Sequence, residues 1–282
     1  MPGEPLDRRR FLMVAGVAVG GALAAGATWL LRADPADIGA SVSSTSSTRV
    51  TTVPTTADPP TTTAAATTTS LPETTIASTT TTDPAVASTV EVICKEAWGA
   101  RPVIGEFAGH TIEHITVHHT AVVLSANSAA PGRARQHQSY HQGLGWPDLA
   151  YHYLIDANGH VYEGRPVDAV GNTGTDYDPT GHFLVCCEGD FNTQEITPAQ
   201  YKSLVKMLSW GAAEFGVDAA AIRGHRDVAA TTCPGDNLYL LVADGTIAAD
   251  VAAQLAAGAP QLEKVCGQEA ADLVAAIEAG TV

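Results

Sequence analysis

Residues 112–121 read Ile-Glu-His-Ile-Thr-Val-His-His-Thr-Ala, a mostly apolar run rich in β-branched side chains. Such a run is typical of a central strand in a sheet. It includes two adjacent histidines, His118 and His119. Successive side chains of a strand point to opposite faces, so only one of the two can contribute to a given site. The stretch therefore predicts a strand that carries one candidate functional imidazole.

Further strands and helices are expected on the C-terminal side of this run. Residues 150–155 and 160–163 predict two strands joined through Asn158-Gly159, which is a strong signal for a hairpin turn. Residues 182–187 form another apolar run that predicts a strand. Strands mixed with helices predict an α/β fold in which a mixed central β-sheet is flanked by helices.

The helices are marked by their termini and by their composition. Residues 136–143 predict a short helix, and residues 246–257 and 268–279 predict two Ala-rich terminal helices. A longer helix is expected to begin after Thr197, because Thr197 and Gln200 have the spacing of a capping box. Gly216 is expected to end that helix.

Composition divides the chain into three parts. Residues 1–32 contain paired arginines followed by an apolar run, which predicts a twin-arginine-type export signal or a retained membrane anchor. Residues 33–90 are rich in Thr, Ser and Pro, with too few large apolar groups to form a core, and predict a disordered tether. Residues 91–282 contain all five cysteines and are expected to fold as one domain.

The acidic charge balance of the chain argues against nucleic acid as a binding partner. The chain has 15 Lys and Arg against 30 Asp and Glu, a formal net charge of −15. Nucleic acid is not expected as a partner, because phosphate binding requires clustered basic side chains. Contact with a membrane is expected only through residues 1–32, if that segment is not cleaved.

Several histidines and one cysteine could bind a metal ion. Imidazole and thiolate are preferred zinc ligands, and His118 could share an ion with His225 and Cys233, which lie eight positions apart. A rival pair, His137 and His141, has the i, i+4 spacing of neighbours on one helix face. From the residues alone, unrelated structural histidines remain a third possibility.

Five ordered blocks carry a resemblance to a known family. They are residues 95–102 (KEAWGARP), 115–121 (ITVHHTA), 144–155 (LGWPDLAYHYLI), 159–165 (GHVYEGR) and 224–236 (GHRDVAATTCPGD). Together they resemble the zinc-dependent N-acetylmuramoyl-L-alanine amidases of type 2 and the peptidoglycan recognition proteins. The resemblance covers residues 94–240, and the helices at 246–279 lie beyond it.

The resemblance implies a function and a set of site residues. The expected activity is hydrolysis of the amide between N-acetylmuramic acid and L-alanine, with peptidoglycan as the partner through its stem peptide and muramyl sugar. The family's zinc ligands fall on His118, His225 and Cys233, and imply one catalytic Zn²⁺. Its active-site tyrosine falls on Tyr151. Many lytic relatives have Lys or Thr where this chain has Thr231.

Two parts of the chain bear on how the substrate would be contacted: Glu188 and the stretch at 168–190. Glu188, at the end of the strand at 182–187, is either a site carboxylate, as in some bacterial amidases, or a charge at a strand end. Residues 168–190 depart from the family, which commonly has a histidine before that strand. The alternatives to an amidase are a peptidoglycan-binding module without turnover and a domain whose zinc is structural.

The expected location follows from the export signal and the substrate. The protein is expected to be located outside the cytoplasm: secreted, in the cell wall, or tethered to the outer face of the membrane. It is expected to act as a monomer. Cys94 and Cys266 flank the folded domain and remain available if Cys233 binds zinc. They are expected to form a disulfide, which an exported protein can keep.

Overall fold

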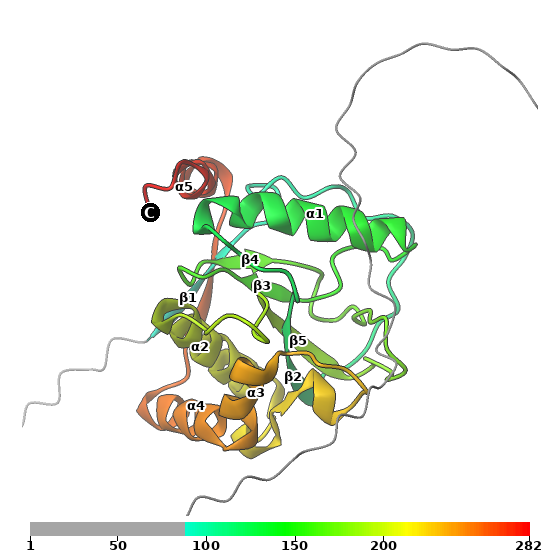
Figure 1. The fold of residues 1–282 in the computed structure, drawn as a ribbon, viewed down its shortest axis with the longest axis vertical. Coiled ribbons are helices and arrows are strands. Elements are labelled where there is room, and N and C mark those ends of the chain that lie inside the picture. Colours follow the sequence, from blue (N-terminus) through cyan, green and yellow to red (C-terminus); the bar gives the residue numbers. More distant parts are fainter. Residues whose placement is uncertain (1–87) are drawn as a thin grey trace, which may run out of the picture. The chain divides into compact units, whose positions relative to one another are not determined.

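The computed structural model describes residues 88–282 (Figure 1). The expected export segment at 1–32 and residues 33–87 of the expected tether lie outside the described residues. The first strand begins at Thr89, so regular structure starts before residue 91, where the folded domain was expected to begin.

One seven-stranded sheet forms the centre of the domain, and its strands follow the order β6-β2-β5-β3-β4-β1-β7. The strands are β1 (Thr89–Ile93), β2 (His114–His119), β3 (Tyr153–Ile155), β4 (Val161–Glu163), β5 (His182–Cys187), β6 (Arg223–Gly224) and β7 (Gln261–Val265). All neighbours are parallel except β3 and β4, which are antiparallel. The predicted mixed sheet and hairpin are therefore confirmed.

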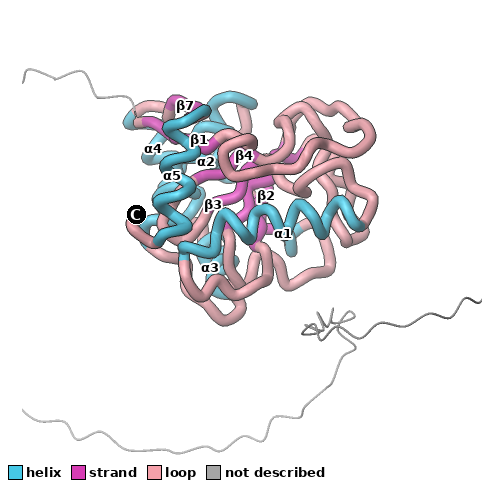
Figure 2. The backbone as a smooth tube through the Cα atoms, turned by 90° about the horizontal axis from the view of Figure 1, so that it is seen from above, coloured by secondary structure: helices cyan, strands magenta, loops and turns pink. Residues whose placement is uncertain are grey.

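Helices cover both faces of this sheet. They are α1 (Ala130–Gly143), α2 (Pro198–Phe215), α3 (Asp236–Ala243), α4 (Thr246–Ala257) and α5 (Gly267–Ala279). Figure 1 shows α1 and α5 on one face and α2, α3 and α4 on the other. Figure 2 shows that α5 lies beside the start of α1. Among residues 88–282 no single helix is long and apolar enough to cross a membrane, and α3 with α4 reaches that length only as a pair bent by 60°.

Two apolar clusters fill the space between the sheet and the helices. Side chains of α2 and α4 pack with those of β2 and β5, including Ile115 and Phe183, both fully buried. Side chains of α1 and α5 pack on the opposite face with Leu154, Tyr162 and the fully buried Trp98. The strands are thus buried on both faces, as is usual for parallel sheets covered by helices.

Several elements differ from the expected ones. The first helix begins at Ala130 rather than at residue 136, because Pro131 occupies its first turn, where a missing N–H is tolerated. The strand expected at 112–121 is limited to His114–His119. The strands β1, β6 and β7 and the helix α3 were not predicted from the sequence. The two terminal helices match their expected positions within one residue.

The start of α2 confirms one part of the predicted capping box and corrects the other. Thr197 Oγ1 accepts a hydrogen bond from the Gln200 amide nitrogen at 3.1 Å, as an N-cap should. The Gln200 side chain does not reach back to Thr197. Its amide instead donates to the backbone oxygens of Ile155 and Glu188, at 2.9 and 3.0 Å. Gln200 therefore ties the helix to the ends of β3 and β5.

The two ends of the described chain are joined. The strand β1 pairs in parallel with β7 over five positions, and the Cys94 amide donates to the Val265 oxygen at 2.9 Å. A disulfide joins Cys94 to Cys266, across a sequence separation of 172 residues, and confirms the expected pairing.

Replacement of both Cys94 and Cys266 by serine should lower the free energy of unfolding by about 2–4 kcal/mol, because the closed loop is long. Urea unfolding followed by circular dichroism measures this change. Wild-type protein treated with a reductant is the control and should unfold at the same urea concentration as the double variant. Equal unfolding of the oxidised wild type and the double variant would contradict the prediction.

Candidate metal centre

The pairing of two short segments brings His118 and His225 together. The strand β6 pairs in parallel with β2, with Arg223 opposite Thr116 and Gly224 opposite Val117. Each strand then continues into a histidine, His118 on β2 and His225 directly after β6. Their ring centroids lie 4.5 Å apart. The sheet register therefore places two imidazoles, 107 positions apart in sequence, side by side.

A loop after β6 returns to the same place with Cys233. The Arg226 amide donates to the Cys233 oxygen at 2.9 Å, and Arg226 also forms an ion pair with Asp236 at 2.8 Å. The turn that follows requires Gly235, which has φ of 89° and packs so closely that a Cβ would lie 2.5 Å from the Phe191 carbonyl carbon. These contacts hold the thiol beside the two imidazoles.

The three side chains form a compact group of metal-ligand atoms. One ligand atom from each of His118, His225 and Cys233 lies within 4.8 Å of the others, and Cys233 Sγ is 3.7 Å from His118 Nδ1. The other nitrogen of His118, Nε2, is buried and has no hydrogen-bond partner among the described residues. Two imidazoles and a thiol, buried and close together, form a donor set that fits a bound zinc ion.

Burial keeps these groups in their neutral forms. Burial, followed by the proximity of His225, lowers the pKa of His118 well below its usual value. Burial lowers the pKa of His225 to about 4. Burial also raises the pKa of the Cys233 thiol to about 12. The imidazoles are therefore in the form that binds metals, whereas a cation would have to displace the thiol proton.

The neighbouring histidine on β2 has a different role. His119 points to the other face, where its Nδ1 accepts a hydrogen bond from the Phe191 amide at 3.3 Å and its ring stacks on Phe191. The group of possible ligand side chains includes His118 and not His119, as expected for adjacent residues of a strand.

The rival pair on α1 does not form a metal site. His137 Nε2 lies 3.0 Å from a carboxylate oxygen of Glu188, and His141 Nδ1 accepts a hydrogen bond from the Ala150 amide at 3.1 Å. One other group of possible ligands occurs among residues 88–282, namely Cys94, Glu96 and Glu163. Its cysteine is committed to the disulfide.

A cavity of about 210 Å³ opens beside the three ligand residues. Its walls come from β2, from the end of α1, from the loop before β3 and from the loops around residues 172–175 and 231–233. Tyr151 and Thr231, the two catalytic candidates inferred from the family, both line it. Trp146 and His141 form an aromatic wall, with ring centroids 5.0 Å apart.

Tyr151 lies against the candidate ligands. Its ring centroid is 5.3 Å from that of His118 and 5.9 Å from that of His141. Burial, together with the nearby thiols of Cys186 and Cys233, raises the pKa of Tyr151 well above its usual value. The phenol therefore stays protonated and can donate a hydrogen bond at neutral pH.

Thr231 and Glu188 are placed differently with respect to the cavity. Thr231 Oγ1 accepts a hydrogen bond from the Cys233 amide at 3.2 Å, so this residue helps to shape the loop that carries the thiol. Glu188 is not among the residues that line the cavity. Its side chain is fully buried, and both carboxylate oxygens lie within 3.1 Å of His137 Nε2.

Two residues that contact His225 were not indicated by the sequence. The hydroxyls of Thr173 and Thr175 lie 3.5 and 3.0 Å from His225 Nε2. Both lie within residues 168–190, the stretch in which the sequence is expected to differ from the family. Short hydroxyl side chains around a glycine in a loop have no distinctive spacing, so no sequence pattern would have identified them.

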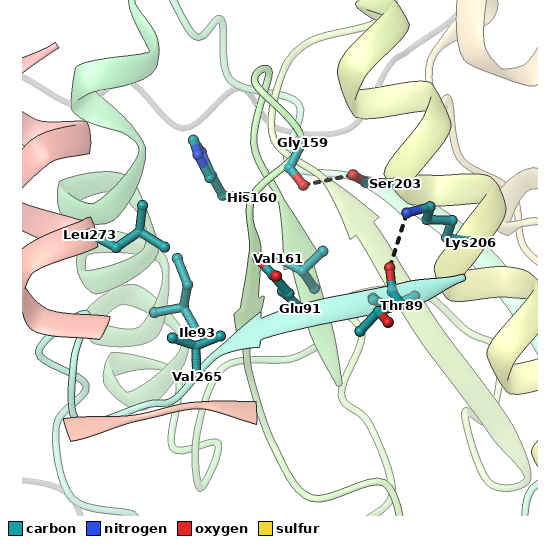
Figure 3. Close-up of a pocket in the computed structure, with 11 residues that line it drawn as sticks. Thr89, Glu91, Ile93, Gly159, His160, Val161, Ser203, Lys206, Val265 and Leu273 are labelled. Atoms are coloured by element: carbon teal, nitrogen blue, oxygen red, sulfur yellow. Dashed lines mark hydrogen bonds between the residues drawn. The ribbon is translucent and has the colours of Figure 1, made fainter. Parts of the chain in front are cut away.

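A second cavity, of about 490 Å³, lies at the β4-β1-β7 end of the sheet, away from β2 and β6, and is drawn in Figure 3. The strands β1, β4 and β7 and the helices α2 and α5 contribute to its wall. Two of its polar side chains are bound to backbone oxygens. Ser203 Oγ donates to Gly159 at 2.7 Å, and Lys206 Nζ donates to Thr89 at 3.0 Å. The metal-ligand groups found among residues 88–282 lie elsewhere, so the smaller cavity is the candidate site.

Comparison with known proteins identifies the family of this chain. The sequence pattern of the family described as N-acetylmuramoyl-L-alanine amidase matches residues 108–236. Peptidoglycan-recognition protein SC2 of Drosophila melanogaster is 32% identical over 155 residues, which cover 53% of this chain and 83% of that protein. Peptidoglycan recognition protein 1 of Mus musculus is 31% identical over 156 residues, which cover 54% and 85%.

The fold is shared as well. The crystal structure of Drosophila peptidoglycan recognition protein SD matches this structure with a TM-score of 0.50 at 24% identity, over 54% of this chain and 92% of that one. By its sequence and its fold, this chain belongs to the family of peptidoglycan recognition proteins and N-acetylmuramoyl-L-alanine amidases.

Proposed function

We propose that this protein is an exported zinc-dependent N-acetylmuramoyl-L-alanine amidase that degrades or remodels peptidoglycan. The convergence of His118, His225 and Cys233 within 4.8 Å beside an open cavity carries the proposal. The match to the amidase family pattern supports it. The reaction breaks the amide C–N bond. Water supplies a hydroxyl to the lactyl carbonyl carbon and a proton to the amine of L-alanine.

The donor set suits zinc in a catalytic arrangement. Three protein ligands, two imidazoles and one thiolate, are typical of catalytic rather than structural zinc, for which four protein ligands are usual. A zinc ion bound there would polarise the scissile carbonyl and make a water molecule more acidic. Among residues 88–282, the ligand group contains no fourth His, Cys, Asp or Glu.

Tyr151 would stabilise the charge that develops on the carbonyl oxygen. Its phenol lines the cavity next to His118, and its raised pKa keeps the proton on the oxygen. A protonated, positioned phenol is a donor of the kind that stabilises an oxyanion, and it needs no reorganisation during the reaction.

Thr231 and Glu188 would have smaller roles. The Thr231 oxygen accepts a bond from the Cys233 amide, and its own proton can be donated into the cavity that it lines. Glu188 would act from behind the cavity wall. Burial and the two thiols are the main causes of the raised Tyr151 pKa, and the Glu188 carboxylate adds to it, so Glu188 helps to hold the phenol in its donor form.

The place of action follows from the substrate. Peptidoglycan lies outside the cytoplasm, and the twin-arginine-type pattern in residues 1–32 provides a route for export. The disulfide between Cys94 and Cys266 is compatible with an oxidising compartment. The acidic domain would be held to its substrate by the cavity rather than by charge.

Removal of the metal should stop the release of stem peptides from purified peptidoglycan, because the reaction depends on the ion held by His118, His225 and Cys233. Mass spectrometry of defined muropeptides before and after treatment with a chelator measures this, and added Zn²⁺ should restore the activity. His118→Ala should be inactive but folded, as judged by circular dichroism.

Two other outcomes would contradict the proposal. Binding of peptidoglycan without release by the zinc-loaded wild type would identify a recognition module. Unfolding of His118→Ala, or of the wild type on chelation, would identify a structural ion, because the folding of such domains depends on the metal.

Tyr151→Phe should lower kcat by about 10²–10³-fold, the usual cost of one oxyanion donor. Phenylalanine keeps the ring that packs against His118 and His141, so zinc content and thermal stability should stay at the wild-type level. Steady-state kinetics on a muropeptide, with zinc measured by mass spectrometry, test this. A wild-type kcat in Tyr151→Phe would remove Tyr151 from the mechanism.

Thr231→Val should lower kcat by about 10²-fold if the hydroxyl donates to the oxyanion. Thr231→Ser is the matched control, because it keeps both the acceptor for the Cys233 amide and the donated proton. A wild-type kcat in Thr231→Val would remove the Thr231 hydroxyl from the mechanism.

A further inference from the structure

We propose that Thr175, supported by Thr173, is a positioning residue that holds His225 in the tautomer and orientation required to bind the metal. The inference rests on the proposed function, because it concerns the same site. It assigns a role to the loop at residues 171–181, which lies within the stretch at 168–190 that is expected to differ from the family.

The hydroxyls form a short chain of hydrogen bonds that ends on the imidazole. Thr175 Oγ1 lies 3.0 Å from His225 Nε2 and 2.8 Å from Thr173 Oγ1. The Thr175 amide also donates to Thr173 Oγ1, at 3.2 Å. Thr173 Oγ1 is thus placed to accept from both the amide and the hydroxyl of Thr175. With its proton directed to Thr173, Thr175 Oγ1 can accept from His225.

This direction of the hydrogen bonds selects one tautomer of the histidine. A neutral imidazole has one N–H, and the nitrogen without a proton is the one that can bind a metal. If Nε2 donates to Thr175, the proton is on Nε2 and the lone pair is on Nδ1. Thr175 would therefore leave Nδ1 as the His225 nitrogen that can bind a metal together with His118 and Cys233.

The loop is fixed well enough to perform this role. At its start, Gly171 packs against β5 so closely that a Cβ would lie 2.2 Å from Leu184 Cδ1. At its end, the Gly181 amide donates to His110 Nδ1 at 2.8 Å. Between these points the ring of Tyr177 lies 5.1 Å from that of His225. The imidazole is therefore contacted by an aromatic ring and by the threonine pair, all from one anchored loop.

The size of the expected effect follows from other metal sites. Loss of the group that hydrogen-bonds the second nitrogen of a ligand histidine typically weakens metal binding by about 10- to 100-fold. Thr175→Val removes the hydroxyl at nearly constant volume, and Thr175→Ser keeps it. Thr180→Val is the matched control, because Thr180 is an exposed residue close to the end of the same loop.

The experiment measures zinc affinity by competition with a chromophoric chelator for the wild type and the three variants. Thr175→Val should bind zinc about 10- to 100-fold more weakly. Thr175→Ser and Thr180→Val should remain within a factor of three of the wild type, as expected when the hydrogen bond to His225 is kept. The visible spectrum of the Co²⁺-loaded protein should change in Thr175→Val alone, and the melting temperature of the metal-free protein should be the same in all four.

Each other outcome overturns the inference. Wild-type affinity in Thr175→Val shows that the hydrogen bond does not position His225. A weaker affinity that serine does not restore, or that accompanies a lower melting temperature of the metal-free protein, shows that Thr175 acts only in the packing of the loop. If the wild type itself does not bind zinc, both the proposed function and the inference are refuted. The zinc titration of the wild type distinguishes this outcome from failure of the inference alone.

Discussion

The pairing of two residues of β6 with β2 is the contact on which the site depends. It sets the register so that both segments continue into a histidine at the same edge of the sheet. The adjacent pairing of β2 with β5 fixes the other side of His118, which lies opposite Cys186. A shift of one residue in either pairing would move His118 to the opposite face and replace it with His119. The fold therefore positions the candidate ligands His118 and His225 through backbone pairing of the strands.

The site combines neutral, buried donors with an open cavity beside them. The ligand imidazoles and the thiol are held without charge by desolvation, and the nearby carboxylate, Glu188, is paired with His137 behind the wall. Once the Cys233 thiol has lost its proton, its negative charge would attract a cation strongly, because opposite charges interact more strongly at low dielectric. The protonated phenol of Tyr151 and the loop at 171–181 then surround the cavity on two sides.

The sequence predicted the parts of this protein that depend on local pattern. The apolar run at 182–187, the Asn158-Gly159 turn and the Thr197 N-cap all carry signals within a few residues, and each is found in the structure. Strands β1 and β7 were missed because they pair with each other from opposite ends of the folded domain, and no local sequence pattern shows such a pairing. The ligands were found through family blocks, since spacing alone left His137 and His141 as rivals. The contact of Thr175 with His225 joins loops 50 residues apart, which no local pattern encodes.

The position of β1 has a mechanical consequence. This strand lies between β4 and β7 and runs parallel to both, so a pull on the chain before Thr89 would be carried along the strand. The hydrogen bonds on both edges of β1 would then have to break at the same time for the strand to slide. Breaking them together requires more force than breaking them one after another. The cross-link at Cys94 begins directly after Ile93 and stops any unravelling there. Force applied before Thr89 would therefore be carried by β4, β1 and β7, away from β2 and β6, which lead into the candidate ligands.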